Sequence, residues 1–500
     1  MDPTGKETPK IEAKLGQWDA VSIIVGIIIG VGIFETPASI FAALPSFWAA
    51  LGVWVVGGLV ALIGALCFAE LATTYPRSGG EYVYLTRAFG PLAGFLFAWA
   101  QLTVIRPGSI GAVAYVFAFY ADTMLGLQGH GVFLLASISV ITLTLINVLG
   151  VVLGAWTQNL LTAAKVLGLV ALVVVGFAFG SPDNLAGQAV PSSGSWFSLL
   201  AALATVMMAV LWTYSGWQEA AYVVAEIKDR RRNIPRALLL GTAAVTVIYV
   251  VVNAAYVYGL GFQAIQERQS TFAAGMLELG LPGLGAKAMA VLVIVSALGA
   301  INGMIFTTAR IYAEFGLDHR LFSPLSHWSR RLGTPARALI VTGVITLVLI
   351  GGVSLYEWWN QRNVPLLGAS SVGLMAAPAG PVGELTTAVA IPAPTSNTFN
   401  TMLEYTAAVF WFFFLLTSLA FFMLRRIDGD VYRPFRVPLY PYIPLVFCAW
   451  CAGMTIGVIV DQPLVSLVGL GTLLVGLPFY FWPQKRRRQP AEKMLEPVAH

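Results

Sequence analysis

Apolar stretches of about twenty residues recur along almost the whole 500-residue chain, separated by shorter polar segments. A helix of about 20 apolar residues spans the roughly 30 Å hydrocarbon core of a bilayer. We therefore predict an all-α polytopic membrane protein with twelve transmembrane helices. Their cores are expected near 18–43, 47–75, 91–120, 131–150, 156–180, 198–226, 236–261, 287–314, 336–356, 402–424, 440–460 and 464–482.

The composition favours the same class of protein. Hydrophobic residues make up 58% of the chain and charged residues only 11%, whereas soluble proteins are about a quarter charged. So few charges would leave a soluble fold without a polar surface. The first segment is polar and charged and does not have the pattern of a cleavable signal peptide. We expect a cytoplasmic segment at 1–16, a membrane domain at 17–482 and a cytoplasmic tail at 483–500.

The basic residues predict the orientation in the membrane. Twenty-four of the 29 Lys and Arg residues lie in or next to segments that twelve spans would place on one side. Cytoplasmic loops carry the excess of such residues, so both termini are predicted to be cytoplasmic, in a multi-pass cell (inner) membrane protein. The net charge of +5 follows from this topology, and we expect no nucleic-acid partner. The lipid bilayer is the expected surrounding.

The cysteines and histidines indicate neither a disulfide nor a metal site. Cys67, Cys448 and Cys451 all lie inside apolar segments, so no disulfide-linked ancillary subunit is evident. The four histidines are scattered over loops and the tail. We therefore expect no metal and no cofactor.

One outer connection, 358–401, is unusually long. It has five prolines, many small residues and little charge, and proline at this spacing disfavours another span. The sequence leaves two interpretations, a plain insertion or a partly ordered lid.

The first helix contains a candidate break. It reads GIIIGVGIFETP from Gly26 to Pro37, a poor sequence for a continuous helix. Unwinding near Gly30 to Gly32 would free backbone groups at membrane depth, where they must line a protein cavity. Amides beyond the break suit a carboxylate, and carbonyls before it suit an ammonium, so one broken helix offers both halves of an α-amino-acid site. The alternative is helix packing, because Gly26 and Gly30 also form a GxxxG face.

The sixth helix shows a second candidate break. Small residues, Ser215 and Gly216, interrupt an aromatic run that begins at Trp212. Interrupted helices at corresponding positions of two halves indicate inverted five-helix repeats with the binding site at their interface. For Trp217, packing in the core or against lipid explains the residue as well as a functional role does.

Lys165 is the most informative charge within the predicted spans. If its helix begins near Ala155, ten residues at 1.5 Å each place the lysine about 15 Å deep, where a charge is costly and usually functional. It could reach carbonyls freed by the break in helix 1. The alternative is a lysine that extends to the membrane interface.

Other charges are assigned structural roles first. Arg106 is expected to pair with a carboxylate or to kink its helix, and Glu70 and Glu226 to pair with basic loop residues. Glu219 is expected in a structural pair, with a role in coupling as the alternative. Glu35 follows the first break and could favour cations in the vestibule.

Six motifs together resemble a known superfamily. They are GIIIGVGIF at 26–34, AELATTYPRSGGEY at 69–82, VIRPGS at 104–109, TQNLLTAAK at 157–165, WTYSGWQEAAYVVAE at 212–226 and SALGAINGMIFTTARIYAEFG at 296–316. In this order they resemble the amino acid–polyamine–organocation superfamily, and within it the L-type amino-acid transporters and their bacterial relatives. The resemblance implies a LeuT-like fold, a five-plus-five inverted repeat with broken helices 1 and 6 and two further helices outside the core.

The resemblance also implies the roles of particular residues. The substrate carboxylate would meet amides of Val31, Gly32 and Ile33 beside Gly30, and the ammonium would meet carbonyls near Ile28, Trp212 and Ser215, beside Gly216. Trp212 would close over the substrate as a gate. Lys165 would bridge helices where sodium-coupled cousins hold a sodium ion. Two departures affect specificity, since Val31 stands where relatives usually have serine and Gln218 where many have asparagine.

These features predict a secondary active transporter of amino acids, with sodium-independent exchange of neutral L-amino acids by alternating access. A proton-coupled amino-acid symporter and a polyamine or cationic amino-acid symporter are the alternatives. A membrane-embedded enzyme would need a catalytic group of residues that the scattered histidines do not supply. No glycine-rich phosphate loop follows a strand, so an ATP-driven pump is disfavoured.

Overall fold

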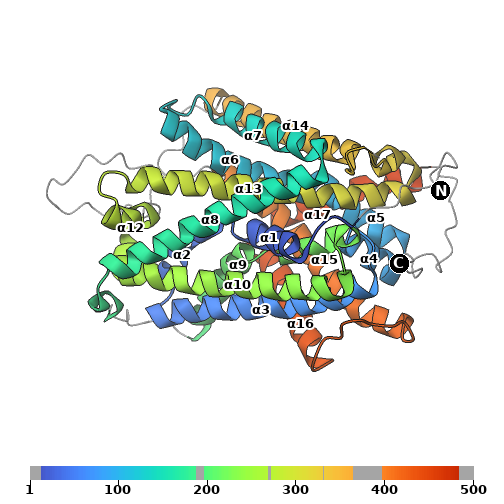
Figure 1. Cartoon of the computed structure of the whole chain (residues 1–500), viewed down its shortest axis with the longest axis horizontal. Helices are drawn as coiled ribbons and strands as arrows, with labels where there is room; N and C mark the ends of the chain where they lie inside the picture. The colour runs from blue at the N-terminus through green and yellow to red at the C-terminus, as the bar shows by residue number, and fades with distance from the viewer. Residues whose placement is uncertain (1–12, 187–195, 269–271, 330, 364–396, 483–500) are drawn as a thin grey trace.

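A computed structural model describes residues 13–186, 196–268, 272–329, 331–363 and 397–482. This part of the chain is helical and has no strand, apart from one isolated bridge between Leu15 and Ile227. Figure 1 shows long helices lying side by side in one bundle. The elements that make up the bundle are α1 (Gln17–Ile28), α2 (Gly32–Ala43), α3 (Phe47–Thr74), α5 (Pro91–Ala100), η1 (Gln101–Ile105), α6 (Arg106–Leu125), α7 (Val132–Leu149), α8 (Val151–Phe179), α9 (Trp196–Thr213), η3 (Trp217–Glu226), α10 (Arg230–Leu260), α13 (Gly285–Asp318), α14 (Ala336–Asn363), α15 (Asn397–Ile427), α16 (Tyr442–Asp461) and α17 (Pro463–Phe481).

The helices confirm a polytopic membrane protein, whereas the number of twelve spans stays a prediction. In the described residues, ten helices are long and apolar enough to cross a membrane, and the bent pair α1 and α2 brings the number to eleven at most. The number twelve is therefore not confirmed. The expected sixth span is present as α9 and η3, but its second half is a 3-10 helix of only ten residues.

Both predicted breaks are confirmed. Helix 1 stops at Ile28 and resumes at Gly32, with a bend of 47° between its halves. Helix 6 stops at Thr213 and resumes at Trp217. The fold of α8 corrects one boundary, because this helix begins at Val151 rather than near Ala155. Lys165 is therefore fourteen residues, or roughly 21 Å, from the start of its helix.

The shorter elements lie at the two ends of the bundle. They are α4 (Glu81–Phe89), η2 (Pro182–Ala186), α11 (Phe262–Arg268), α12 (Phe272–Gly280) and η4 (Arg320–Ser326). In Figure 1, α4 lies toward one end and α12 toward the other. We call the end that holds α4, η4 and the segments 75–80, 227–229 and 428–441 the basic end. Most of the predicted outer loop 358–401 lies outside the described residues.

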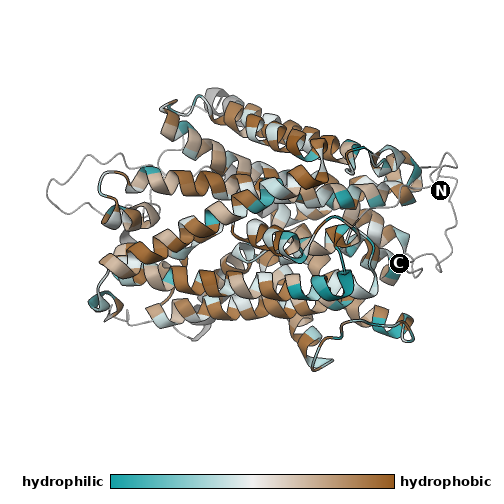
Figure 2. Ribbon diagram, viewed as in Figure 1, coloured by the Kyte–Doolittle hydropathy of each residue, from teal (hydrophilic) through white to brown (hydrophobic). Residues whose placement is uncertain are grey.

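The outer surface of the bundle is apolar. Figure 2 shows hydrophobic residues along the lengths of the outer helices. On α8, for example, Leu153, Trp156, Leu160 and Leu167 expose between 43% and 69% of their surface. Apolar side chains exposed over a surface this large indicate contact with lipid.

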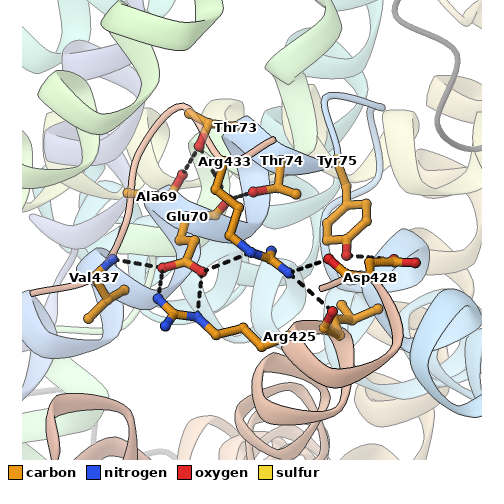
Figure 3. A network of polar contacts seen from close by, with 10 residues as sticks. Ala69, Glu70, Thr73, Thr74, Tyr75, Arg425, Asp428, Arg433 and Val437 are labelled. Atoms are coloured by element: carbon orange, nitrogen blue, oxygen red, sulfur yellow. Dashed lines mark hydrogen bonds and ion pairs between the residues drawn. The ribbon is translucent and has the colours of Figure 1, made fainter. Parts of the chain in front are cut away.

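Ion pairs hold the basic end together (Figure 3). The Glu70 carboxylate of α3 accepts hydrogen bonds from Arg425 of α15 at 2.8 and 2.5 Å and from the Val437 amide at 2.7 Å. Asp428 accepts hydrogen bonds from the Tyr75 hydroxyl at 2.7 Å and from Arg87 at 2.6 and 3.1 Å. Glu70 was expected to pair with basic loop residues; Arg433 of the following loop lies 3.8 Å away, but the closer partner, Arg425, belongs to α15.

Glu226 pairs with an arginine of a helix, Arg310, rather than with the expected basic loop residue. Its two oxygens accept hydrogen bonds from Arg310 of α13 at 2.7 and 2.9 Å, and both side chains are buried. The Leu15 amide donates to the Glu226 carbonyl at 2.9 Å, and the Lys228 amide donates to the Leu15 carbonyl at 2.9 Å. The start of helix 1 and the end of helix 6 are thus joined to each other and to α13 at the basic end.

Candidate substrate site

The break in helix 1 redirects its backbone hydrogen bonds. The Gly30 amide donates to the Ile28 carbonyl at 2.7 Å. In a continuous α-helix it would donate to the Gly26 carbonyl instead. The Ile29 carbonyl instead accepts from the Ser296 hydroxyl at 3.0 Å, and the same hydroxyl lies 3.0 Å from the Gly30 carbonyl. Polar groups of α13 therefore satisfy backbone groups that the break releases inside the membrane.

The break in helix 6 depends on a glycine. Gly216 has φ of +114°, a left-handed conformation that favours glycine. A Cβ atom at this position would also come within 2.8 Å of the Ile27 side chain of α1. The chain can therefore turn here, directly against helix 1, only where there is no side chain.

The two breaks meet at one cavity of about 100 Å³, enough for several water molecules. Eight of the nine predicted substrate-binding residues line it, namely Ile28, Gly30, Val31, Gly32, Trp212, Ser215, Gly216 and Gln218. Ile33 is the exception, since it is fully buried and does not line the cavity. The structure thus brings together two segments nearly 190 residues apart in the sequence.

One side of the cavity offers amide donors. Gly32 and Ile33 are the first residues of α2, with Val31 as the residue that caps the helix. The first amides of a helix have no acceptor within that helix, and they carry its partial positive charge. A carboxylate placed here would meet hydrogen-bond donors and a favourable potential.

Two of the three predicted carbonyl acceptors, those of Ile28 and Trp212, already have donors. The Ile28 carbonyl accepts from the Gly30 amide and, at 2.7 Å, from the Tyr249 hydroxyl of α10. The Trp212 carbonyl accepts from the amide and the hydroxyl of Ser215, at 3.0 and 2.6 Å. A carbonyl oxygen has two lone pairs, so an ammonium at either oxygen must replace one of these donors.

Lys165 lies against the end of α1. The residue is fully buried, and its ammonium donates to the carbonyls of Gly26 and Ile29 at 2.8 Å each and to that of Ser296 at 3.0 Å. Gly299 of α13 leaves room for the side chain, because a Cβ there would lie 2.7 Å from Nζ. The lysine therefore joins α8, α1 and α13 at the negative end of a helix dipole.

The two glycines of the GxxxG pattern have different surroundings. A Cβ at Gly26 would overlap the side chains of Gln158 and Thr162 on α8, so this glycine serves close helix packing. A Cβ at Gly30 would meet nothing closer than 3.8 Å. Packing against the protein explains Gly26 but does not explain Gly30, which lines the cavity.

The two tryptophans of helix 6 also differ. Trp217 is buried among Phe68, Phe414 and Phe447, with ring centroids 4.9 to 5.9 Å apart, as expected for a core residue. Trp212 instead borders the cavity beside helix 1, where a Cβ at Gly32 would lie 3.0 Å from its ring.

Part of the cavity wall was not predicted. The missed lining residues come from other helices and include Ser109, Ala112, Val113, Ala300, Met304 and Phe410. Arg106 and Glu219 also line the cavity, although the sequence singled them out only as membrane charges. Their guanidinium and carboxylate groups are 2.6 Å apart, which confirms the expected pairing of Arg106. In the described residues, no three His, Cys, Asp or Glu side chains are grouped as a metal site would require.

Comparisons with known proteins agree with this architecture. A family model described as amino acid permease matches residues 15–494. The b(0,+)-type amino acid transporter 1 of Mus musculus is 29% identical over 99% of this chain and 94% of its own length. That of Oryctolagus cuniculus is 31% identical over 74% of this chain and 77% of its own length. The large neutral amino acids transporter small subunit 2 of Mus musculus is 29% identical over 94% of this chain and 81% of its own length.

The family match covers almost the whole chain and includes both broken helices and Lys165. A cavity between two broken helices is also where many secondary transporters bind their substrates. The chain belongs to the amino acid permease family.

Proposed function

We propose that this protein exchanges neutral L-amino acids across the membrane, independently of sodium, by alternating access. The α-amino and α-carboxyl groups would bind at the two breaks, with the carboxylate at Val31, Gly32 and Ile33. The ammonium would bind near the carbonyls of Ile28 and Trp212. The names of its relatives, which include a large neutral amino acids transporter, support this substrate class.

The position of Lys165 is the observation that carries sodium independence. Its ammonium lies 2.8 Å from two carbonyls of α1 and 3.0 Å from one of α13. Carbonyl oxygens drawn from two helices are the ligands that a sodium ion takes at broken helices of transporters. A fixed ammonium already satisfies them, so no metal cation is needed to hold α1 against α13.

We infer that the basic end faces the cytoplasm in the cell (inner) membrane, with both termini on that side, because the Lys and Arg residues gather there. We further propose 17–482 as the transporter domain, flanked by cytoplasmic segments 1–16 and 483–500. The protein would function without a disulfide-linked subunit, since its three cysteines lie in the membrane helices α3 and α16.

Uptake by purified protein in liposomes tests this proposal. Labelled leucine should enter liposomes preloaded with unlabelled leucine, and entry should be slow when they are empty. Replacing external sodium with choline should leave the rate unchanged. Equal uptake into empty liposomes driven by a proton gradient would instead show symport, and a strong sodium requirement would refute the role given to Lys165.

A further inference from the structure

A buried ion pair forms part of the cavity wall. Arg106 Nη2 lies 2.6 Å from Glu219 Oε1, and the two side chains are 5% and 2% exposed. Both residues line the substrate cavity. The pair therefore lies next to the bound molecule, at a depth where water screens charges poorly.

Further polar atoms of the pair are held by residues of α13 and of the preceding turn η1. Glu219 Oε2 accepts a hydrogen bond from the Thr307 hydroxyl of α13 at 2.5 Å. Arg106 Nε donates to the Gln101 side chain at 2.9 Å, and its guanidinium lies 5.4 Å from the centre of the Tyr222 ring. Arg106 directly follows the π-helical turn η1, and such turns occur frequently at functional sites.

The pair leaves this part of the wall without net charge. The Glu219 carboxylate by itself would attract a cationic side chain and repel an anionic one, whereas the Arg106 guanidinium by itself would do the reverse. Together their fields largely cancel at distances greater than the 2.6 Å between the two groups. Another buried carboxylate nearby, Glu81, accepts a hydrogen bond from the Tyr222 hydroxyl at 3.0 Å but is not among the residues that line the cavity.

We propose that the Arg106–Glu219 pair determines the charge of the substrate side chain, with mutual neutralisation of the two groups restricting the cavity to uncharged side chains. This inference rests on the proposed amino-acid site at the two breaks and adds the residues that discriminate by charge. The substrate class is thus set by the balance of two wall charges, in addition to the shape of the cavity.

The test compares leucine, lysine and glutamate as ligands of purified protein, by competition against labelled leucine. The parent should prefer leucine to both charged amino acids. Arg106→Met leaves Glu219 unpaired and should raise the affinity for lysine relative to leucine at least tenfold. Glu219→Gln leaves Arg106 unpaired and should raise the relative affinity for glutamate by a similar factor.

Two further variants separate charge from structural damage. The double variant Arg106→Met with Glu219→Gln has no wall charge, so it should again prefer leucine. Arg77→Met breaks an ion pair of similar length, 2.7 Å to Glu314, outside the cavity, and should leave the order of ligands unchanged.

A parent that binds lysine as tightly as leucine would overturn the proposal, and so would unchanged lysine-to-leucine and glutamate-to-leucine ratios in the folded single variants. If Arg106→Met does not fold, Glu219→Gln alone decides through its glutamate affinity. These affinity ratios do not depend on exchange or on sodium. Failure of the proposed transport mode in the liposome assay is therefore distinguishable from failure of this inference.

Discussion

Lys165→Ala is the substitution that tests the architecture of the site most directly. The change removes the ammonium that donates to Gly26, Ile29 and Ser296. The Ile29 carbonyl keeps the Ser296 hydroxyl as a donor at 3.0 Å. The Gly26 carbonyl is affected most, because the Gly30 amide, its donor in a continuous helix, is bonded to Ile28.

The expected magnitude follows from these contacts. Leaving a buried acceptor without a donor costs about 1–3 kcal/mol, and removing a buried charge returns part of that cost. If the broken form of helix 1 loses about 1–3 kcal/mol relative to other conformations, its population relative to them falls by roughly 5- to 160-fold. We expect the exchange rate to fall by a similar factor while the protein stays folded.

The assay is exchange of labelled leucine in liposomes, normalised to folded protein measured by size-exclusion chromatography. Lys287→Ala is the matched control, because this lysine is exposed near the start of α13 and its loss should leave the rate unchanged. Exchange by folded Lys165→Ala at the rate of the parent would refute the reasoning, since the break would then hold without the ammonium.

Three further predictions address binding, stability and orientation. Gly32→Leu should abolish binding of every amino acid, because the leucine side chain would fill the space between the α2 amides and Trp212. Trp212→Ala should instead slow flux far more than it weakens equilibrium binding. Equal loss of binding in the two variants would make Trp212 a recognition residue rather than a gate. Glu226→Gln leaves the buried Arg310 guanidinium without its charged partner, at a cost of about 3–5 kcal/mol. The variant should therefore unfold at a lower temperature in detergent. An unchanged unfolding temperature would show that the pair adds no net stability. Cysteines placed at Asn233 and Ser371 should react with an impermeant thiol reagent from opposite sides of the membrane, and labelling of both from one side would contradict the topology.

Hydrophobicity was sufficient to predict where the spans lie, because a helix that crosses a bilayer needs about twenty predominantly apolar residues. The local helix geometry within the spans could not be predicted from hydrophobicity. The π-helical turn at Gln101–Ile105 and the 3-10 helix at Trp217–Glu226 depend on tertiary hydrogen bonds, which hydropathy does not record.

The site was predictable where glycine or charge marked it. Gly30 and Gly216 indicated breaks because glycine and other small residues in the middle of a span are unfavourable for a continuous helix. Lys165 stood out because charge at membrane depth is rare. Ala112, Met304 and Phe410 also line the cavity, yet such residues are equally common on surfaces that face lipid. Only the packing of α6, α13 and α15 around the breaks distinguishes them.

The occupied carbonyls connect substrate recognition with movement. The Tyr249 hydroxyl lies 2.7 Å from the Ile28 carbonyl and 3.2 Å from the Thr213 carbonyl, so α10 holds the ends of both broken helices. An ammonium that takes the place of this hydroxyl at Ile28 would release α10 from helix 1 as it binds. A ligand changes a conformational equilibrium only by binding one state more tightly than the other. Competition for a single carbonyl would provide such a difference, because the proposed ammonium and the Tyr249 hydroxyl need the same acceptor at Ile28.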